Sequence, residues 1–192
     1  MPNLPEQFSE VVSHMNQAAV EIDLDRGLEG IDVDNIQWGA YKITQPHARM
    51  PFVDIPALWL VGQGLKYTYS GGKRYAYMAG KAFVMFYPMA VETEIVEASP
   101  EVPLLVAGAA LNMPRMLAVL QRVERVEGPS PRVKAADPSG LIEVQLTEKL
   151  LTPFLRLFRT LDNPTDAAIL TDGILDELYY RLLSGERGAE LR

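Results

Sequence analysis

The sequence predicts an α+β fold, mainly β, in which a β-barrel or jelly roll is followed by C-terminal α-helices. Three observations predict it. Apolar residues at helical spacing occur at the two ends of the chain, strand-like segments separated by turn residues fill the middle, and a pair of glycines marks a tight hairpin there. We therefore divide the chain into an N-terminal helix and arm (residues 1–34), a barrel (35–112) and a helical segment (113–192).

The N-terminal helix is expected over residues 5–20. Phe8, Val12 and Met15 recur there at helical spacing, and Pro5 suits the first turn of a helix because its missing N–H costs little there. Residues 23–34 are acidic and predict a loop.

The middle of the chain predicts six or seven strands at intervals of about ten residues, which favours a sandwich or a barrel. The Gly71-Gly72 pair should form the two-residue turn of a hairpin, because glycine supplies the positive φ angles that such turns need. The expected strands cover residues 36–44, 57–63, 65–70, 73–78, 82–87, 91–97 and 103–111.

The C-terminal part predicts helices over residues 114–123, 147–161 and 172–184, with a short helical piece at 167–170. Residues 127–140 contain several prolines and glycines and predict a loop. Pro153 should either kink the middle helix or begin a shorter one capped by Thr152.

The composition excludes several classes of protein. The net charge of −7 disfavours the basic face that binds nucleic acids, and the absence of cysteine excludes disulfides and thiol chemistry. The N-terminus lacks the basic start and apolar run of a signal peptide, and the longest apolar run, residues 102–111, has about half the length of a membrane helix. We expect a cytoplasmic, soluble protein.

The residues that commonly carry catalysis are sparse. His14 and His47 are the two histidines, too few for a three-ligand metal centre on a barrel, and no Gly-x-Ser-x-Gly motif is present. Glu92 and Glu94 share one face of a strand. They could form an acid/base pair or bind a cationic ligand, but such a pair is more commonly the solvated side of a strand. The segment 62–64 begins like a dinucleotide-binding loop but lacks the third glycine and the following helix. We therefore expect no catalytic residues, no metal and no cofactor.

Aromatic side chains on the predicted strands instead indicate a pocket for a small organic molecule. A filled core is the alternative, since small barrels often have no cavity. The candidate ligand-binding residues are Trp38, Tyr41, His47, Trp59, Tyr67, Tyr69, Tyr87 and Glu92.

The C-terminal helices have wide apolar stripes. Such stripes suit a helix–helix homodimer, although packing within one chain would produce the same pattern. The candidate dimerisation residues are Leu150, Phe154, Leu157, Phe158 and Leu161.

Several short motifs occur in an order that resembles the N-terminal domain of one branch of the AraC/XylS transcription regulators. An apolar strand at 57–61 leads into Gln-Gly-x-Lys at 63–66, and the glycine hairpin is followed by Tyr-x-Tyr-x-Ala-Gly at 75–80 and Tyr-Pro at 87–88. Ala-Ser-Pro-Glu-x-Pro (98–103), Leu-Asp-x-Pro (161–164) and Tyr-x-Leu-Leu-x-Gly (180–185) complete the series. One departure is Gly62, where family members often have leucine, and we expect a looser strand there.

The resemblance implies a cupin-like barrel, a homodimer, a small-molecule effector, and a helix-turn-helix domain that would follow residue 192 and bind DNA. The expected function is therefore effector sensing and dimerisation in a transcription regulator, not enzymatic activity. The alternatives are a metal-free cupin-type enzyme, such as a sugar isomerase or lyase, and a purely structural dimerisation module.

Overall fold

The chain folds into two β-sheets and a layer of helices. The structure is a computed structural model that describes residues 3–24, 37–128 and 140–190. Most of the loops expected at 23–34 and 127–140, and the start of the expected strand at residue 36, therefore lie outside the described residues. The elements in order are α1 (Leu4–Ala18), β1 (Val20–Glu21), β2 (Trp38–Ile43), β3 (His47–Asp54), β4 (Ala57–Gln63), β5 (Leu65–Ser70), β6 (Lys73–Met78), β7 (Ala82–Met85), β8 (Met89–Glu97), β9 (Leu104–Ala110), α2 (Met113–Glu127), β10 (Leu141–Val144), α3 (Glu148–Thr160), α4 (Pro164–Leu183) and the 3₁₀ turn η1 (Gly188–Glu190).

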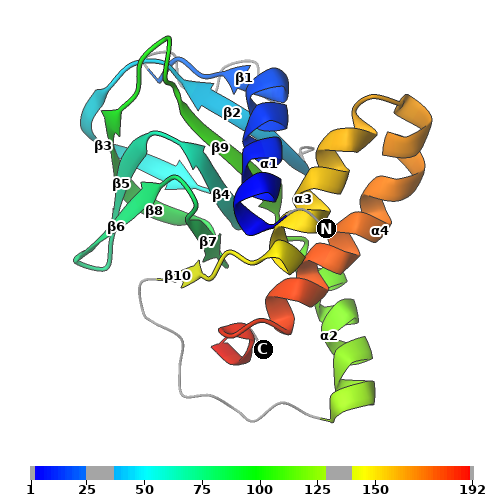
Figure 1. The fold of residues 1–192 in the computed structure, drawn as a ribbon. Coiled ribbons are helices and arrows are strands. Elements are labelled where there is room, and N and C mark those ends of the chain that lie inside the picture. The colour runs from blue at the N-terminus through cyan, green and yellow to red at the C-terminus, as the bar shows by residue number, and fades with distance from the viewer. Residues whose placement is uncertain (1–2, 25–36, 129–139, 191–192) are drawn as a thin grey trace.

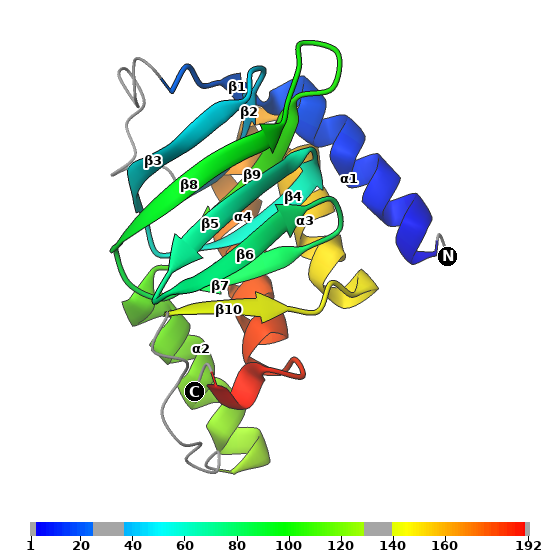
Figure 2. The same ribbon diagram turned by 90° about the vertical axis from the view of Figure 1, so that its left-hand side faces the viewer.

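The strands form one sheet of six, in the order β1-β2-β9-β4-β7-β10, and one of four, in the order β3-β8-β5-β6. All pairs are antiparallel except β1 with β2. The two sheets lie on one side of the molecule, and α1, α3 and α4 pack on the other side of the six-stranded sheet (Figures 1 and 2). The molecule therefore has three layers: helices, six-stranded sheet and four-stranded sheet.

This layering explains the two kinds of strand in the sequence. β4 and β9 are apolar along nearly their whole length because one face of each contacts the helices and the other contacts the four-stranded sheet. In β5, by contrast, buried residues alternate with half-buried ones, because one face of the four-stranded sheet faces solvent. Strands with two covered faces thus carry no period-two signal.

The helices pack through one apolar core. Leu151, Phe154 and Phe158 of α3 are fully buried in it together with Leu178 of α4. Local signals set the ends of these helices: Asn3 forms a capping box with Glu6 at the start of α1, and the Thr147 side chain accepts a hydrogen bond from the N–H of Leu150 at the start of α3.

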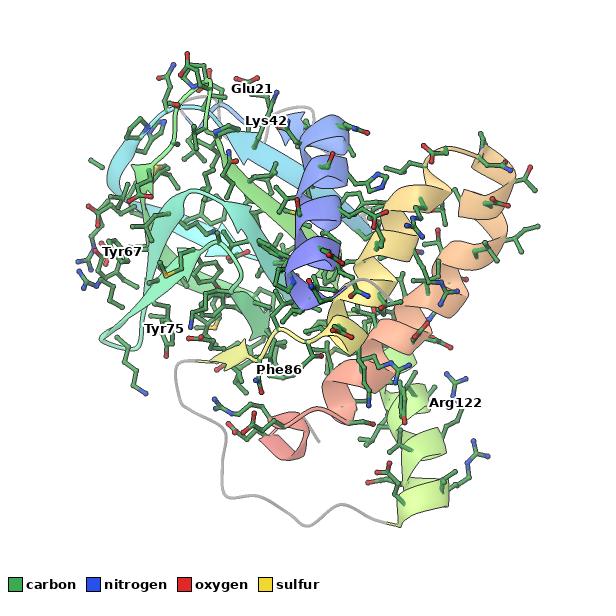
Figure 3. The ribbon with its side chains drawn as sticks, in the orientation of Figure 1. Glu21, Lys42, Tyr67, Tyr75, Phe86 and Arg122 are labelled. Carbon is green, nitrogen blue, oxygen red and sulfur yellow. The ribbon has the colours of Figure 1, made fainter. Side chains whose placement is uncertain are left out.

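Ion pairs join α2 to α4. Arg115 of α2 binds Asp172 and Asp176 of α4, at 2.6 and 2.5 Å, and Arg122 binds Asp176 at 2.7 Å. Figure 3 shows Arg122 on α2, beside α4. These contacts hold α2 against the rest of the helical layer.

The structure confirms the α+β class and corrects the architecture. The described strands form two separate sheets and no closed barrel, because no described strand of one sheet pairs with a strand of the other. Three strands were not expected: β1, at the end of the predicted N-terminal helix, β3, where we placed His47 in a loop, and β10, which follows the predicted loop and pairs with β7.

The C-terminal helices also differ from the prediction. The piece predicted at 167–170 and the helix predicted at 172–184 form one continuous helix, α4. Pro153 lies inside α3 and does not begin a shorter helix. At Gly62, where we expected a looser strand, β4 is continuous and its pairing with β9 shifts register between Val61 and Gln63. A Cβ at Gly62 would lie only 2.9 Å from Met15 Cε, so this glycine also makes room for α1.

Candidate functional site

A cavity of about 280 Å³ lies between the two sheets. It is lined by β2, β4 and β9 of the large sheet and by β3, β5 and β8 of the small one, and the segment that follows α1 adds Val20, Ile22 and Leu24. Its volume falls near the lower end of the roughly 300–1,000 Å³ typical of small-molecule pockets. Most of its wall is apolar: Val20, Ile22, Leu24, Trp38, Ile43, Phe52, Val53, Ile55, Trp59 and Ile95, with the small residues Gly39, Ala40, Ala57, Gly108 and Ala110.

β1 is held at the edge of the cavity by polar contacts to β2. The N–H of Ile22 donates to the carbonyl of Lys42 at 2.9 Å, and the Glu21 carboxylate lies 3.7 Å from the Lys42 ammonium (Figure 3). The chain between α1 and residue 24 therefore forms part of the cavity wall.

Two charged residues, Lys66 and Asp54, line the cavity although both are buried, at 6 % and 4 % exposure. The Lys66 ammonium donates to the Tyr41 hydroxyl at 3.3 Å and lies 4.8 Å from the centre of the Tyr77 ring. Asp54 accepts a hydrogen bond from the N–H of Ile55 at 3.0 Å. The apolar cavity thus has polar groups in its wall, and each has a partner within the chain.

The pKa values of these groups follow from burial and from each other's charges. Burial disfavours the charged form of Lys66, but Tyr41 and Asp54 outweigh it, so the pKa of Lys66 lies above its usual value. Burial raises the pKa of Asp54, and Lys66 and the N–H of Ile55 offset this only in part, so the pKa of Asp54 lies above its usual value. Burial also raises the pKa of Tyr41, so its hydroxyl stays protonated at neutral pH.

Two tryptophans connect the cavity to its surroundings. The Trp59 ring covers Gly108 on the neighbouring strand and contacts Tyr41 edge-on, with ring centres 6.2 Å apart. Trp38 lines the cavity and also packs edge-on against Phe158 of α3, with ring centres 5.4 Å apart. Trp38 is therefore a direct contact between the cavity and the helical layer.

Of the expected ligand-binding residues, the structure brings Trp38, Tyr41 and Trp59 together at the cavity. The others lie elsewhere. His47 is half-buried at the start of β3, and Tyr87 is exposed beside Gly140. Tyr67, Tyr69 and Glu92 lie on the outer face of the four-stranded sheet, where Figure 3 shows Tyr67 pointing away from the molecule.

The outer face has its own contacts. Arg49 stacks on Tyr69 at 3.8 Å and pairs with Glu92, and the Tyr69 hydroxyl donates to Glu94 at 2.6 Å. Glu92 and Glu94 thus lie on the solvated side of β8, the more common interpretation of that pair. Tyr67 packs under Arg74.

The sequence did not indicate Asp54, Lys66, Thr93 or Phe52 as cavity residues. β5 was expected to turn its tyrosines inward, whereas Lys66, Thr68 and Ser70 are the buried set. One signal in the sequence could have indicated this: Lys66, Thr68 and Ser70 occupy alternate positions of the strand, so they share the face opposite to the tyrosines. Asp54 and Phe52 belong to β3, which was not predicted as a strand.

The expected dimerisation residues fall into two groups. Leu150, Phe154, Leu157 and Phe158 are buried against other helices of the same chain, whereas Leu161, at the end of α3, is exposed. Packing within the chain therefore accounts for the apolar stripe of α3.

In the parts of the chain that the structure describes, no group of three or more histidine, aspartate or glutamate residues is arranged to hold a metal ion. Across the same residues, no helix is long and apolar enough to cross a membrane.

A sandwich of two sheets that encloses an apolar cavity, with helices packed on one face, defines a domain built around a small-molecule-sized site. The chain belongs to the AraC-type transcriptional regulator N-terminus family, whose model matches residues 38–190. No curated protein matches the chain significantly.

Solved structures show a similar fold. An apo variant of ToxT from Vibrio cholerae aligns with a TM-score of 0.51 and 7 % identity, over 78 % of this chain and 56 % of that one. ToxT bound to (E)-4-(8-methylnaphthalen-1-yl)but-3-enoic acid aligns with a TM-score of 0.51 and 10 % identity, over 77 % and 55 %. This chain thus spans little more than half of the ToxT chains that it resembles.

Proposed function

We propose that this domain binds a small, mainly apolar effector between its two sheets and thereby regulates transcription through a DNA-binding region outside this chain. The observation that carries the proposal is the apolar cavity of about 280 Å³ with Lys66 and Asp54 in its wall. A filled core, the structural alternative, would leave no such space. The aromatic acid bound by ToxT supports the idea that this fold accommodates small organic molecules.

The route from the cavity to the helices would use two contacts. Trp38 packs against Phe158 of α3, and Val20 continues directly from α1 into the cavity wall. An effector that moves either residue would favour one arrangement of the helical layer over another. Through the C-terminal helices, that shift would reach a DNA-binding domain of the helix-turn-helix class.

We also propose a homodimer, formed at the turn between α3 and α4. Leu161, Ile169 and Leu170 are large apolar side chains exposed on either side of that turn. The double substitution Leu161→Asp and Ile169→Asp should shift the sedimentation coefficient from dimer to monomer. A wild-type chain that sediments as a monomer at high concentration would remove this part of the proposal.

The cluster of Lys66, Tyr41 and Asp54 also bears on the enzymatic alternative. A lysine that acts as a base or nucleophile needs a lowered pKa, and the pKa of Lys66 is raised instead. A tyrosine whose pKa is raised by burial is likewise a poor base. These directions favour recognition of a ligand over proton transfer.

Binding can be tested with N-phenyl-1-naphthylamine, an uncharged probe that fluoresces in apolar surroundings. The variant Ala110→Leu adds volume inside the cavity and should weaken binding at least about tenfold, since the displaced space is small and mainly apolar. The matched control Ala90→Leu makes the same change on an exposed position of β8 and should bind as the wild type does. Equal binding by both variants would show that the probe binds elsewhere.

A further inference from the structure

The cavity wall contains one acidic and one basic residue, and this balance bears on the kind of effector that fits. Among the described residues that line the cavity, Asp54 and Lys66 are the two with ionisable charge at neutral pH. They come from different strands, β3 and β5, and are held there by the fold of the small sheet. Both are more than nine-tenths buried, so solvent screens their charges little.

The two charges stabilise each other. The charge of Asp54 favours the protonated form of Lys66, and the charge of Lys66 favours the ionised form of Asp54. Tyr41, the direct hydrogen-bond partner of Lys66, stays neutral, so it satisfies the ammonium without supplying a counter-charge. The cavity wall therefore has no net charge while Asp54 is ionised.

A ligand that brings a carboxylate into this space would leave the site with a net negative charge. An uncompensated charge is disfavoured in a protein interior because it loses its hydration. An uncharged group such as a hydroxyl or carbonyl can still accept a hydrogen bond from Lys66 or Tyr41, and it leaves the balance intact.

Resting on the binding function proposed above, we propose that the effector is an apolar molecule with an uncharged hydrogen-bonding head group, such as an alcohol or a ketone. Asp54 is the residue that determines this specificity, because it already supplies the counter-charge of Lys66. The site therefore differs in its preference from one that holds its ligand by a carboxylate.

Two probes with the same body test the proposal: 4-(naphthalen-1-yl)butan-1-ol and 4-(naphthalen-1-yl)butanoic acid, titrated calorimetrically into the chain at neutral pH. The wild type should bind the alcohol about tenfold or more tightly than the acid. Asp54→Asn, which keeps the shape and removes the negative charge, should raise the affinity for the acid about tenfold or more and leave the alcohol nearly unchanged.

Two further variants complete the design. Asp162→Asn makes the same change at an exposed position between α3 and α4 and should leave the ratio of affinities as in the wild type. Lys66→Met leaves Asp54 as the one charge in the wall and should weaken binding of the acid more than binding of the alcohol. If Asp54→Asn does not fold, the ratio of the two affinities in the wild type still decides the proposal.

The outcomes separate the two proposals. If the wild type binds the acid as tightly as the alcohol, or if Asp54→Asn leaves the ratio unchanged, the head-group proposal is wrong while the binding function stands. If neither probe binds and N-phenyl-1-naphthylamine also fails to bind, the proposed binding function itself is wrong, and the head-group proposal falls with it.

Discussion

Replacing Gly108 by alanine should push Trp59 into the cavity. A Cβ at residue 108 would lie 2.3 Å from Cζ3 and 2.6 Å from Cε3 of the Trp59 ring. A normal carbon contact is about 3.5 Å, so the ring or its strand must move by about 1.2 Å. The indole N–H of Trp59 has no hydrogen-bond partner among the described residues, and the cavity lies next to the ring. The side chain can therefore move without breaking a hydrogen bond, although its edge-on contact with Tyr41 would change.

The expected cost follows from two opposing effects. Overpacking a core costs about 1–3 kcal/mol, while replacing glycine with alanine in a strand recovers about 0.4–1 kcal/mol through the unfolded state. The net loss of stability should be about 1–2 kcal/mol, measured by urea unfolding followed by tryptophan fluorescence. The smaller cavity should weaken binding of the neutral naphthyl alcohol at least about tenfold.

The matched control is Gly173→Ala in α4, where a Cβ meets nothing within 4 Å. That variant should gain about 0.5–1 kcal/mol, the usual difference between glycine and alanine inside a helix, and should bind as the wild type does. If Gly108→Ala unfolds at the wild-type urea concentration and binds the alcohol with unchanged affinity, then Trp59 does not limit the cavity and this reasoning fails.

Two further predictions concern the helical layer. The buried Tyr179 hydroxyl accepts from the N–H of Asn112 at 3.1 Å and donates to the carbonyl of Ala110 at 2.8 Å, so Tyr179→Phe should lower the free energy of unfolding by about 1–3 kcal/mol. An unchanged free energy of unfolding would mean that water replaces both hydrogen bonds of the tyrosine hydroxyl. Although partial burial acts against it, hydrogen bonds from Arg115 and Arg122 lower the pKa of Asp176. A lowered pKa contributes stability above the unfolded value near 3.8, which is lost as the pH falls through the lower folded value. Asp176→Asn should therefore be less stable than the wild type at neutral pH, with the difference shrinking below about pH 4; a difference independent of pH would exclude the ion pairs as its cause.

Local features of the sequence determined the parts of the fold that depend on neighbouring residues. The hairpin of β5 and β6 was predicted with the correct ends from the Gly71-Gly72 pair alone. In the structure both glycines adopt the positive φ angles, 56° and 75°, that the turn requires. The order of short motifs likewise pointed to the AraC-type family, which the match over residues 38–190 confirms.

The tertiary structure alone decided which face of each strand turns inward. Alternation along β5 divides its side chains into two sets, one for each face of the sheet. It does not say which set is buried, so the pattern could not show that Lys66 faces the cavity and Tyr67 faces solvent. The tertiary structure also decided the pairing of β10 with β7, which joins segments more than fifty residues apart. Asp54 and Lys66 line one cavity because β8 pairs with both β3 and β5 in the four-stranded sheet, and this order of strands is not visible in the sequence.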